Sequence, residues 1–226
     1  MIKNLIFDLG DVIIDLDALA AQNALTHISG QAAQYAYATH DKKPDFLNDF
    51  EKGWLNNEEF RQKYRDFLQT NIDDNALDKV WNAILGNFPL QRLTLIDELN
   101  QQKKYRTFLL SNTNSIHIPE VENILQKNSN HQYQTLQTLF EKVYYSQEMG
   151  MRKPDSKIYE QVLKENNLNA NETAFFDDNF DNIQSAKSIN IHSFLIVPQK
   201  NEIIDFFEKD NENQWTLKNI YNENNA

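Results

Sequence analysis

The chain has 226 residues, of which 40% are hydrophobic, and a formal net charge of −11. This composition supports a packed core, either as one large domain or as a core with a smaller module, and it excludes global disorder. Cysteine is absent, which excludes disulfides, thiolate metal sites and a cysteine nucleophile. The negative charge argues against a nucleic-acid partner. No run of about 18 apolar residues and no secretory signal are visible, so we expect no membrane span and a cytoplasmic protein.

A buried strand is predicted over residues 4–7, because the sequence NLIF is mostly apolar, as in a strand covered on both faces. The apolar run ends at a carboxylate, Asp8, and Gly10 follows two residues later, where it allows the backbone to bend tightly. An aspartate at the carboxyl end of a buried parallel strand lies where open α/β sheets bind their ligands. Taken alone, Asp8 is equally consistent with a solvated turn.

A helical insertion is predicted directly after this strand. Apolar residues recur there at helical spacing, and no convincing strand is present. Asn56 and Glu59 have the spacing of an N-terminal capping box. We therefore expect a helical module over residues 17–89, with residues 1–16 and 90–226 forming the core.

The rest of the chain alternates strands and helices. We expect strands over residues 107–110, 142–146, 173–176 and 193–197, and helices over residues 90–100, 158–164, 182–188 and 203–208. This alternation predicts an α/β fold with a doubly wound, mostly parallel sheet. Residues 115–139 are polar and rich in amides, and we expect a long surface loop there. It contains His117 and His131, but neither has a second ligand at helical or turn spacing, so no metal site is expected.

Polar groups follow four of the predicted strands. They are Asp8 after the first strand, Ser111 and Asn112 after the second, Lys153 in the loop beyond the third, and Asp177 and Asp178 after the fourth. The carboxyl ends of parallel strands share one edge of a sheet, so these residues should meet. Their carboxylates favour a small hard cation such as Mg²⁺. Lysine and serine side chains would hold phosphate oxygens, which the cation would bridge to the protein.

The segments around these residues resemble the haloacid dehalogenase superfamily of phosphohydrolases. The matching sequences are FDLGDVI at 7–13, LSNT at 110–113, MRKPD at 151–155 and FFDDNFDN at 175–182. Their order and spacing match as well, and the resemblance extends to about residue 197. The sequences around Ser111 and Lys153 are most similar to those of a bacterial subgroup that contains an α-D-glucose-1-phosphate phosphatase. That subgroup also resembles the phosphatase domain of soluble epoxide hydrolase. The resemblance implies a Rossmann-like core with an inserted helical-bundle cap.

The resemblance also implies roles for individual residues. Asp8 would attack the phosphoryl group and form an aspartyl-phosphate, which water then hydrolyses. Asp8, the backbone carbonyl of Gly10 and one carboxylate of the Asp177–Asp178 pair would ligate Mg²⁺. Asp178 is the favoured ligand, with Asn182 in support. The alternative alignment uses Asp177 with Asp181, and spacing does not decide between the two.

The remaining roles concern the phosphate. Ser111 and Asn112 would bind its oxygens, and Lys153 would neutralise charge on the nucleophile and on the phosphoryl group.

The sequence departs from the family pattern at Gly10, where many of these phosphatases carry a second aspartate as the general acid and base. Asp11 is adjacent, but one step along a bending backbone redirects a side chain. The missing acid and base could be replaced in three ways: by a leaving group of low basicity that needs no proton, by solvent as the proton donor, or by a carboxylate of Asp15 or Asp17 that folds back toward the site.

We therefore expect a Mg²⁺-dependent phosphomonoester hydrolase acting on a small phosphorylated metabolite such as a sugar phosphate. Its partner would be a small-molecule phosphate ester, and we expect it to bind neither nucleic acid nor a membrane. The protein would be a monomer or a weak homo-oligomer. The alternatives are a phosphomutase, which the missing acid/base disfavours, and a non-catalytic binder of phosphorylated ligands, which has little need of a nucleophile.

Overall fold

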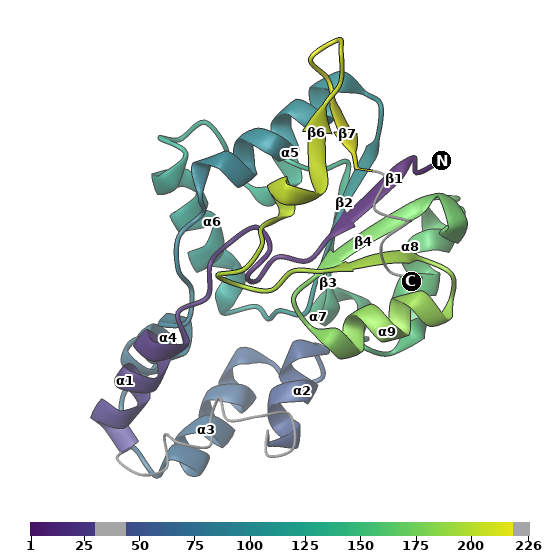
Figure 1. Cartoon of the computed structure of the whole chain (residues 1–226). Coiled ribbons are helices and arrows are strands. Elements are labelled where there is room, and N and C mark those ends of the chain that lie inside the picture. The colour runs from purple at the N-terminus through teal and green to yellow at the C-terminus, as the bar shows by residue number, and fades with distance from the viewer. Residues whose placement is uncertain (30–43, 219–226) are drawn as a thin grey trace.

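A five-stranded parallel sheet forms the centre of the protein (Figure 1). This computed structural model describes residues 1–29 and 44–218. The strands are β1 (Asn4–Phe7), β2 (Arg106–Ser111), β3 (Lys142–Tyr145), β4 (Thr173–Asp177) and β5 (His192–Leu195). Their order is β3-β2-β1-β4-β5, and every neighbouring pair is parallel. The predicted parallel sheet is thus confirmed, with β1 at its middle.

Helices cover both faces of this sheet. They are α5 (Leu90–Gln102), α6 (His117–Asn128), α7 (Ser146–Met149), α8 (Ser156–Glu165) and α9 (Phe180–Ser188). Because successive strand residues point to opposite faces, Leu5 and Phe7 pack in the apolar cluster that contains α5 and α6, whereas Ile6 packs with α8 and α9. All three side chains are fully buried, so β1 is covered on both faces.

In the described part of the chain, four helices between β1 and α5 pack around a second apolar cluster, which also includes Ile116 just before α6. They are α1 (Ala18–Ser29), α2 (Asp45–Glu51), α3 (Asn57–Leu68) and α4 (Asp74–Asn82), and they lie together below the sheet in Figure 1. Phe60 is central to the cluster, stacking on Phe50 with ring centroids 3.9 Å apart and lying 4.9 Å from Trp81. The predicted capping box of Asn56 and Glu59 starts α3.

Two expectations of secondary structure were wrong. Residues 115–139 are not a surface loop: they contain α6 and the short 3-10 helix η3 (Leu136–Thr138), because Val121 and Leu125 form a stripe that packs into the core. The last expected helix is instead a 3-10 turn, η5 (Ile203–Phe206), followed by an antiparallel pair, β6 (Phe207–Lys209) and β7 (Trp215–Leu217). A further 3-10 turn, η4 (Ala170–Glu172), precedes β4. Among the described residues, no helix has both the length and the apolar character that crossing a membrane requires.

Candidate active site

The polar residues that follow the strands meet at one edge of the sheet. The backbone N–H of Asp8 donates to the carbonyl of Phe176 at 2.8 Å, which fixes the residue after β1 against β4. Carboxylate oxygens of Asp8, Asp177 and Asp178 lie within 4.8 Å of one another. The structure thus brings together the three carboxylates that the sequence placed after β1 and β4.

Lys153 lies between two of these carboxylates. Its Nζ is 2.7 Å from Asp8 Oδ1 and 2.6 Å from Asp177 Oδ2, and its side chain is 1% exposed. A buried ammonium group is tolerated when opposite charges pair with it. Burial opposes the charge of Lys153, but the attraction of Asp177 and Asp8 outweighs it and raises the pKa of the lysine.

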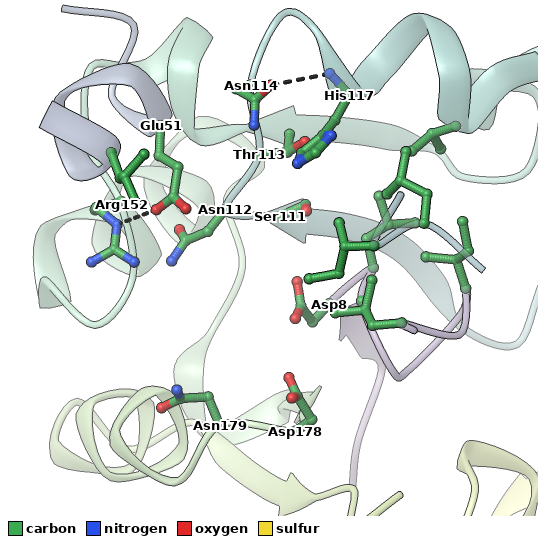
Figure 2. Close-up of a pocket in the computed structure, with 18 of the residues that line it drawn as sticks. Asp8, Glu51, Ser111, Asn112, Thr113, Asn114, His117, Arg152, Asp178 and Asn179 are labelled. Atoms are coloured by element: carbon green, nitrogen blue, oxygen red, sulfur yellow. Dashed lines mark hydrogen bonds and ion pairs between the residues drawn. The ribbon is translucent and has the colours of Figure 1, made fainter. Parts of the chain in front are cut away.

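The two adjacent aspartates have different surroundings. Asp177 is fully buried, and besides Lys153 it accepts hydrogen bonds from the Asn179 N–H at 2.8 Å and the Asn182 amide at 2.9 Å. Asp178 instead lines a cavity, and Figure 2 shows its carboxylate facing Asp8. Asp177 is therefore occupied in holding Lys153, whereas Asp178 is presented to a ligand.

Negative charge is crowded at this edge, because three carboxylates share one ammonium group. Burial raises the pKa of Asp8 to about 8, although Lys153 acts in the opposite direction. Burial, and then the neighbouring Asp177, raise the pKa of Asp178 to about 6. A divalent cation next to Asp8 and Asp178 would relieve this repulsion, and oxygen donors of this kind suit Mg²⁺.

Ser111 and Asn112 also line the cavity, at the end of β2. Both ends of the Asn112 amide bond to the backbone of Lys153: Nδ2 donates to its carbonyl at 2.9 Å, and Oδ1 accepts from its N–H at 2.8 Å. Asn112 therefore holds the loop that carries Lys153, while Ser111 presents a buried hydroxyl beside Asp8 (Figure 2).

The loop after Asp8 directs its other carboxylates elsewhere. Gly10 lines the cavity, but Asp11, Asp15 and Asp17 do not. Asp11 accepts a backbone hydrogen bond within the loop, Asp15 pairs with Arg92 at 2.8 Å, and Asp17 accepts from a backbone N–H in the first turn of α1.

The cavity has a volume of about 410 Å³ and lies between the sheet edge and the helices of the insertion. Glu51 of α2 and Arg152 form an ion pair on one wall of it, with Nε 2.8 Å from Oε2 (Figure 2). His117 and Trp81 line the same cavity. Trp81 is one of the aromatic residues at helical spacing that the sequence shows in the insertion, but spacing does not tell which of them line a pocket. Glu51 was not predicted, because a charged residue on an amphipathic helix carries no local mark of a ligand site.

Known proteins resemble this chain over most of its length. It is 28% identical to a D-ribitol-5-phosphate phosphatase of Bacteroides thetaiotaomicron over 199 residues. This match covers 86% of this chain and 91% of the relative. A crystal structure of a haloacid dehalogenase family enzyme from the same organism, in complex with magnesium and inorganic phosphate, superposes with a TM-score of 0.81. That match has 31% identity and covers 92% of this chain and all of the other.

A second similar structure is that of a predicted haloacid dehalogenase-like hydrolase from Porphyromonas gingivalis. It has a TM-score of 0.79 and 27% identity, and covers 91% of this chain and 96% of the other. The family model for haloacid dehalogenase-like hydrolases matches residues 2–190, which include β1, β2, β3 and β4 with the residues that follow them. The chain therefore belongs to the haloacid dehalogenase-like hydrolases.

Proposed function

We propose that this protein is a Mg²⁺-dependent phosphomonoesterase with Asp8 as its nucleophile. The observation that carries the proposal is the array at the sheet edge: Asp8 paired with Lys153, and Asp178 facing Asp8 across the cavity. Catalysis of phosphoryl transfer depends on positioning the reacting groups and on neutralising the negative charge of the phosphoryl group. Lys153 supplies one positive charge there, and the carboxylates of Asp8 and Asp178 would hold the Mg²⁺ that supplies more.

The reaction follows from these positions. A carboxylate oxygen of Asp8 forms a bond to phosphorus as the bond between phosphorus and the ester oxygen breaks. Water then attacks the aspartyl-phosphate and releases phosphate, which regenerates Asp8. Lys153 stabilises the Asp8 carboxylate before attack and the phosphoryl oxygens during transfer. The hydroxyl of Ser111 donates to a phosphoryl oxygen.

The residues present fit a magnesium ion. Asp8, Asp178 and the carbonyl of Gly10 would hold it, because all three residues line the cavity, whereas the oxygens of Asp177 are engaged by Lys153 and Asn182. Such an ion supplies charge neutralisation for the phosphoryl group. The Mg²⁺ in the similar crystal structure supports this assignment.

The substrate that suits the cavity is the phosphate ester of a polyol or sugar. Its wall carries amides and a mutually neutralised pair, Glu51 with Arg152, which bind hydroxyl groups better than a second anionic group. Asn48 lines the cavity, and its side-chain amide is a polar group that can bond to a substrate hydroxyl. The similar D-ribitol-5-phosphate phosphatase supports this class of substrate. Residues 17–89 would act as the cap that closes over it.

Phosphate release from a panel of sugar, polyol and nucleoside phosphates, with and without Mg²⁺, tests this proposal. We expect activity on polyol or sugar phosphates that requires Mg²⁺ and is lost in Asp8→Asn. Asp181→Asn is the matched control, because Asp181 is an exposed aspartate at the start of α9 and lies outside the cavity lining. Release that survives Asp8→Asn would rule out the mechanism, and binding of phosphate esters without turnover would favour a non-catalytic binder. Transfer to a second position of the same sugar, without release, would indicate a mutase.

A further inference from the structure

The structure leaves open how the leaving group is protonated, because Gly10 has no side chain and the nearby loop carboxylates are directed away from the cavity. We propose that His117 is the general acid that donates a proton to the departing alkoxide of the substrate. This inference rests on the proposed phosphatase function and adds to it a catalytic residue outside the strand-end segments.

His117 lies where such a group is needed. It lines the cavity together with Asp8, Ser111 and Thr113, and Figure 2 shows its ring beside Thr113, above Asp8. In an in-line displacement the leaving oxygen departs on the side of phosphorus opposite the nucleophile. That oxygen therefore points away from Asp8 and toward the upper wall of the cavity, which His117 helps to form.

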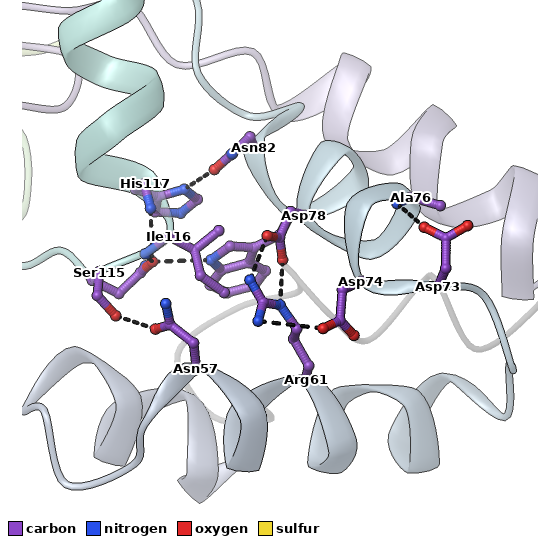
Figure 3. Close-up of polar contacts among 12 residues, drawn as sticks. Asn57, Arg61, Asp73, Asp74, Ala76, Asp78, Asn82, Ser115, Ile116 and His117 are labelled. Atoms are coloured by element: carbon purple, nitrogen blue, oxygen red, sulfur yellow. Dashed lines mark hydrogen bonds and ion pairs between the residues drawn. The ribbon is translucent and has the colours of Figure 1, made fainter.

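The imidazole ring is held in one orientation. It stacks on the indole of Trp81, with centroids 5.0 Å apart and an angle of 3° between the planes. Its Nδ1 lies 2.8 Å from the side-chain oxygen of Asn82 (Figure 3). An amide oxygen only accepts, so the hydrogen is on Nδ1 in the neutral and the charged ring alike. Proton exchange is thereby assigned to Nε2, in the way that an acceptor behind a catalytic histidine fixes its tautomer.

A single buried amide connects the parts of this arrangement. Asn114 is 1% exposed, and its Oδ1 accepts from the Trp81 indole N–H at 3.2 Å, the Ile116 N–H at 3.1 Å and the His117 N–H at 3.0 Å. Asn114 and His117 belong to the segment after β2, whereas Trp81 and Asn82 belong to α4 of the insertion. The ring is therefore positioned only when the helical insertion sits against the core, which couples proton donation to closure of the cavity.

The charged surroundings allow this role. Charged groups on the cavity wall are Asp8, Glu51, Arg152 and Asp178. Those on α4 are Asp74, which pairs with Arg65, and Asp78 and Lys79, and the one in the first turn of α6 is Glu120. Glu51 pairs with Arg152, Asp78 with Arg61, and Glu120 accepts from Asn123. Asp8 and Asp178 are committed to the phosphoryl group and the metal. An imidazole is the side chain that ordinarily suits both the donation and the uptake of a proton near neutral pH.

The proton transfers balance over one cycle. As the bond from phosphorus to the ester oxygen breaks, the Nε2 proton of the imidazolium passes to that oxygen and the product leaves as a neutral alcohol. The neutral ring then takes a proton from the water that attacks the aspartyl-phosphate. Phosphate is released, and the imidazolium is restored.

Two esters with different leaving groups test the inference. D-ribitol 5-phosphate must lose a strongly basic alkoxide, whereas p-nitrophenyl phosphate loses a stable phenolate that needs no proton. For His117→Gln we expect kcat to fall by about 100-fold or more on the first ester and by less than about 3-fold on the second. The alkaline fall of kcat with the polyol ester should also disappear. His131→Gln is the matched control, because His131 is an exposed histidine further along the same segment.

Other outcomes would overturn the inference. Equal losses on both esters, or a higher KM with an unchanged kcat, would make His117 a structural or binding residue. Should His117→Gln fail to fold, Asn82→Leu removes the acceptor behind the ring and must lower kcat on the polyol ester selectively. If the wild type hydrolyses both esters and Asp8→Asn hydrolyses neither, the phosphatase function stands, and a negative result with His117→Gln then concerns the proton donor alone. If the wild type hydrolyses neither ester, the phosphatase function itself has failed.

Discussion

The ammonium group of Lys153 lies 2.6 Å from the carboxylate of Asp177, and neither side chain is more than 1% exposed. This buried pair explains why two adjacent aspartates have different tasks. In β4, alternate residues face opposite sides of the sheet, so Asp177 points to the same side as Phe175, over whose ring the Lys153 ammonium lies at 5.4 Å. Asp178 comes after the strand and turns into the cavity.

The two aspartates should respond in opposite ways to replacement by asparagine. In metal-free buffer, Asp177→Asn should lower the free energy of unfolding by about 3 kcal/mol, because it removes a partner from a buried ion pair. Asp178→Asn should leave stability unchanged or raise it, because it removes a charge that Asp177 repels. Asp178→Asn should also abolish the stabilisation produced by Mg²⁺. Urea denaturation with and without Mg²⁺ measures both effects, and equal losses of stability would contradict this division of roles.

Stability should fall as pH rises when Mg²⁺ is removed. The folded-state pKa of Asp8 is raised to about 8 and that of Asp178 to about 6, both above the ordinary value of 3.8. Between the ordinary and the raised pKa the folded state binds more protons than the unfolded state, so the free energy of unfolding declines with pH. The slope is at most about 1.4 kcal/mol per pH unit for each group. Unfolding at pH 5, 6, 7 and 8 in chelator measures it, and Asp8→Asn should flatten it.

The sequence predicted the sheet and the strand-end residues because their signals are local. Four residues without a charge indicate a buried strand, and β1 has the predicted bounds. The polar residues that follow the later strands were needed as well to place Asp8 at a ligand site. The spacing of the motif could not decide whether Asp177 or Asp178 faces the cavity, because that depends on which residue is the last in β4. A shift of one residue moves a side chain to the other face.

The helix α6 was missed for a different reason. Its apolar stripe is short, and amides around it resemble loop composition. Its start is fixed by Asn114 Oδ1, which bonds to backbone N–H groups and to an indole from α4, and a contact between distant parts of the chain leaves no local pattern. The same holds for His117, because its partner Asn82 in the insertion lies 35 residues earlier, a separation that motif spacing does not capture.

Asn48 should separate substrate binding from folding. Its Oδ1 is buried in the cavity wall without a hydrogen-bond partner among the described residues, so replacement by the apolar Asn48→Leu removes an unsatisfied group and should raise stability slightly. The same change should raise KM for a polyol phosphate about 10-fold, because a hydroxyl loses a polar side chain in the cavity wall. Steady-state kinetics and thermal unfolding measure the two effects, with p-nitrophenyl phosphate as the ester that lacks hydroxyls. An equal rise of KM for both esters would mean that the change distorts the phosphate site.

Gly53 should be the glycine on which seating of the insertion depends. It follows α2 with a φ of +70°, and a Cβ there would lie 2.1 Å from the backbone oxygen of Gln147 in α7. Gly150 has nearly the same φ, +69°, but a Cβ there would meet nothing within 4 Å. Both changes to alanine carry the cost of left-handed backbone, about 1 kcal/mol. Only Gly53→Ala must also push α2 away from α7.

We therefore expect Gly150→Ala to lower the free energy of unfolding by about 1 kcal/mol and to leave kcat/KM nearly unchanged. Gly53→Ala should lose at least about 2 kcal/mol more, because backbone atoms cannot give way as a side chain does. Its kcat/KM for a polyol phosphate should also fall, since α2 carries Glu51, which pairs with Arg152 on the cavity wall. Urea denaturation and steady-state kinetics of the two variants provide the comparison. Similar losses in both would mean that left-handed strain alone, and not the contact with α7, sets the effect at Gly53.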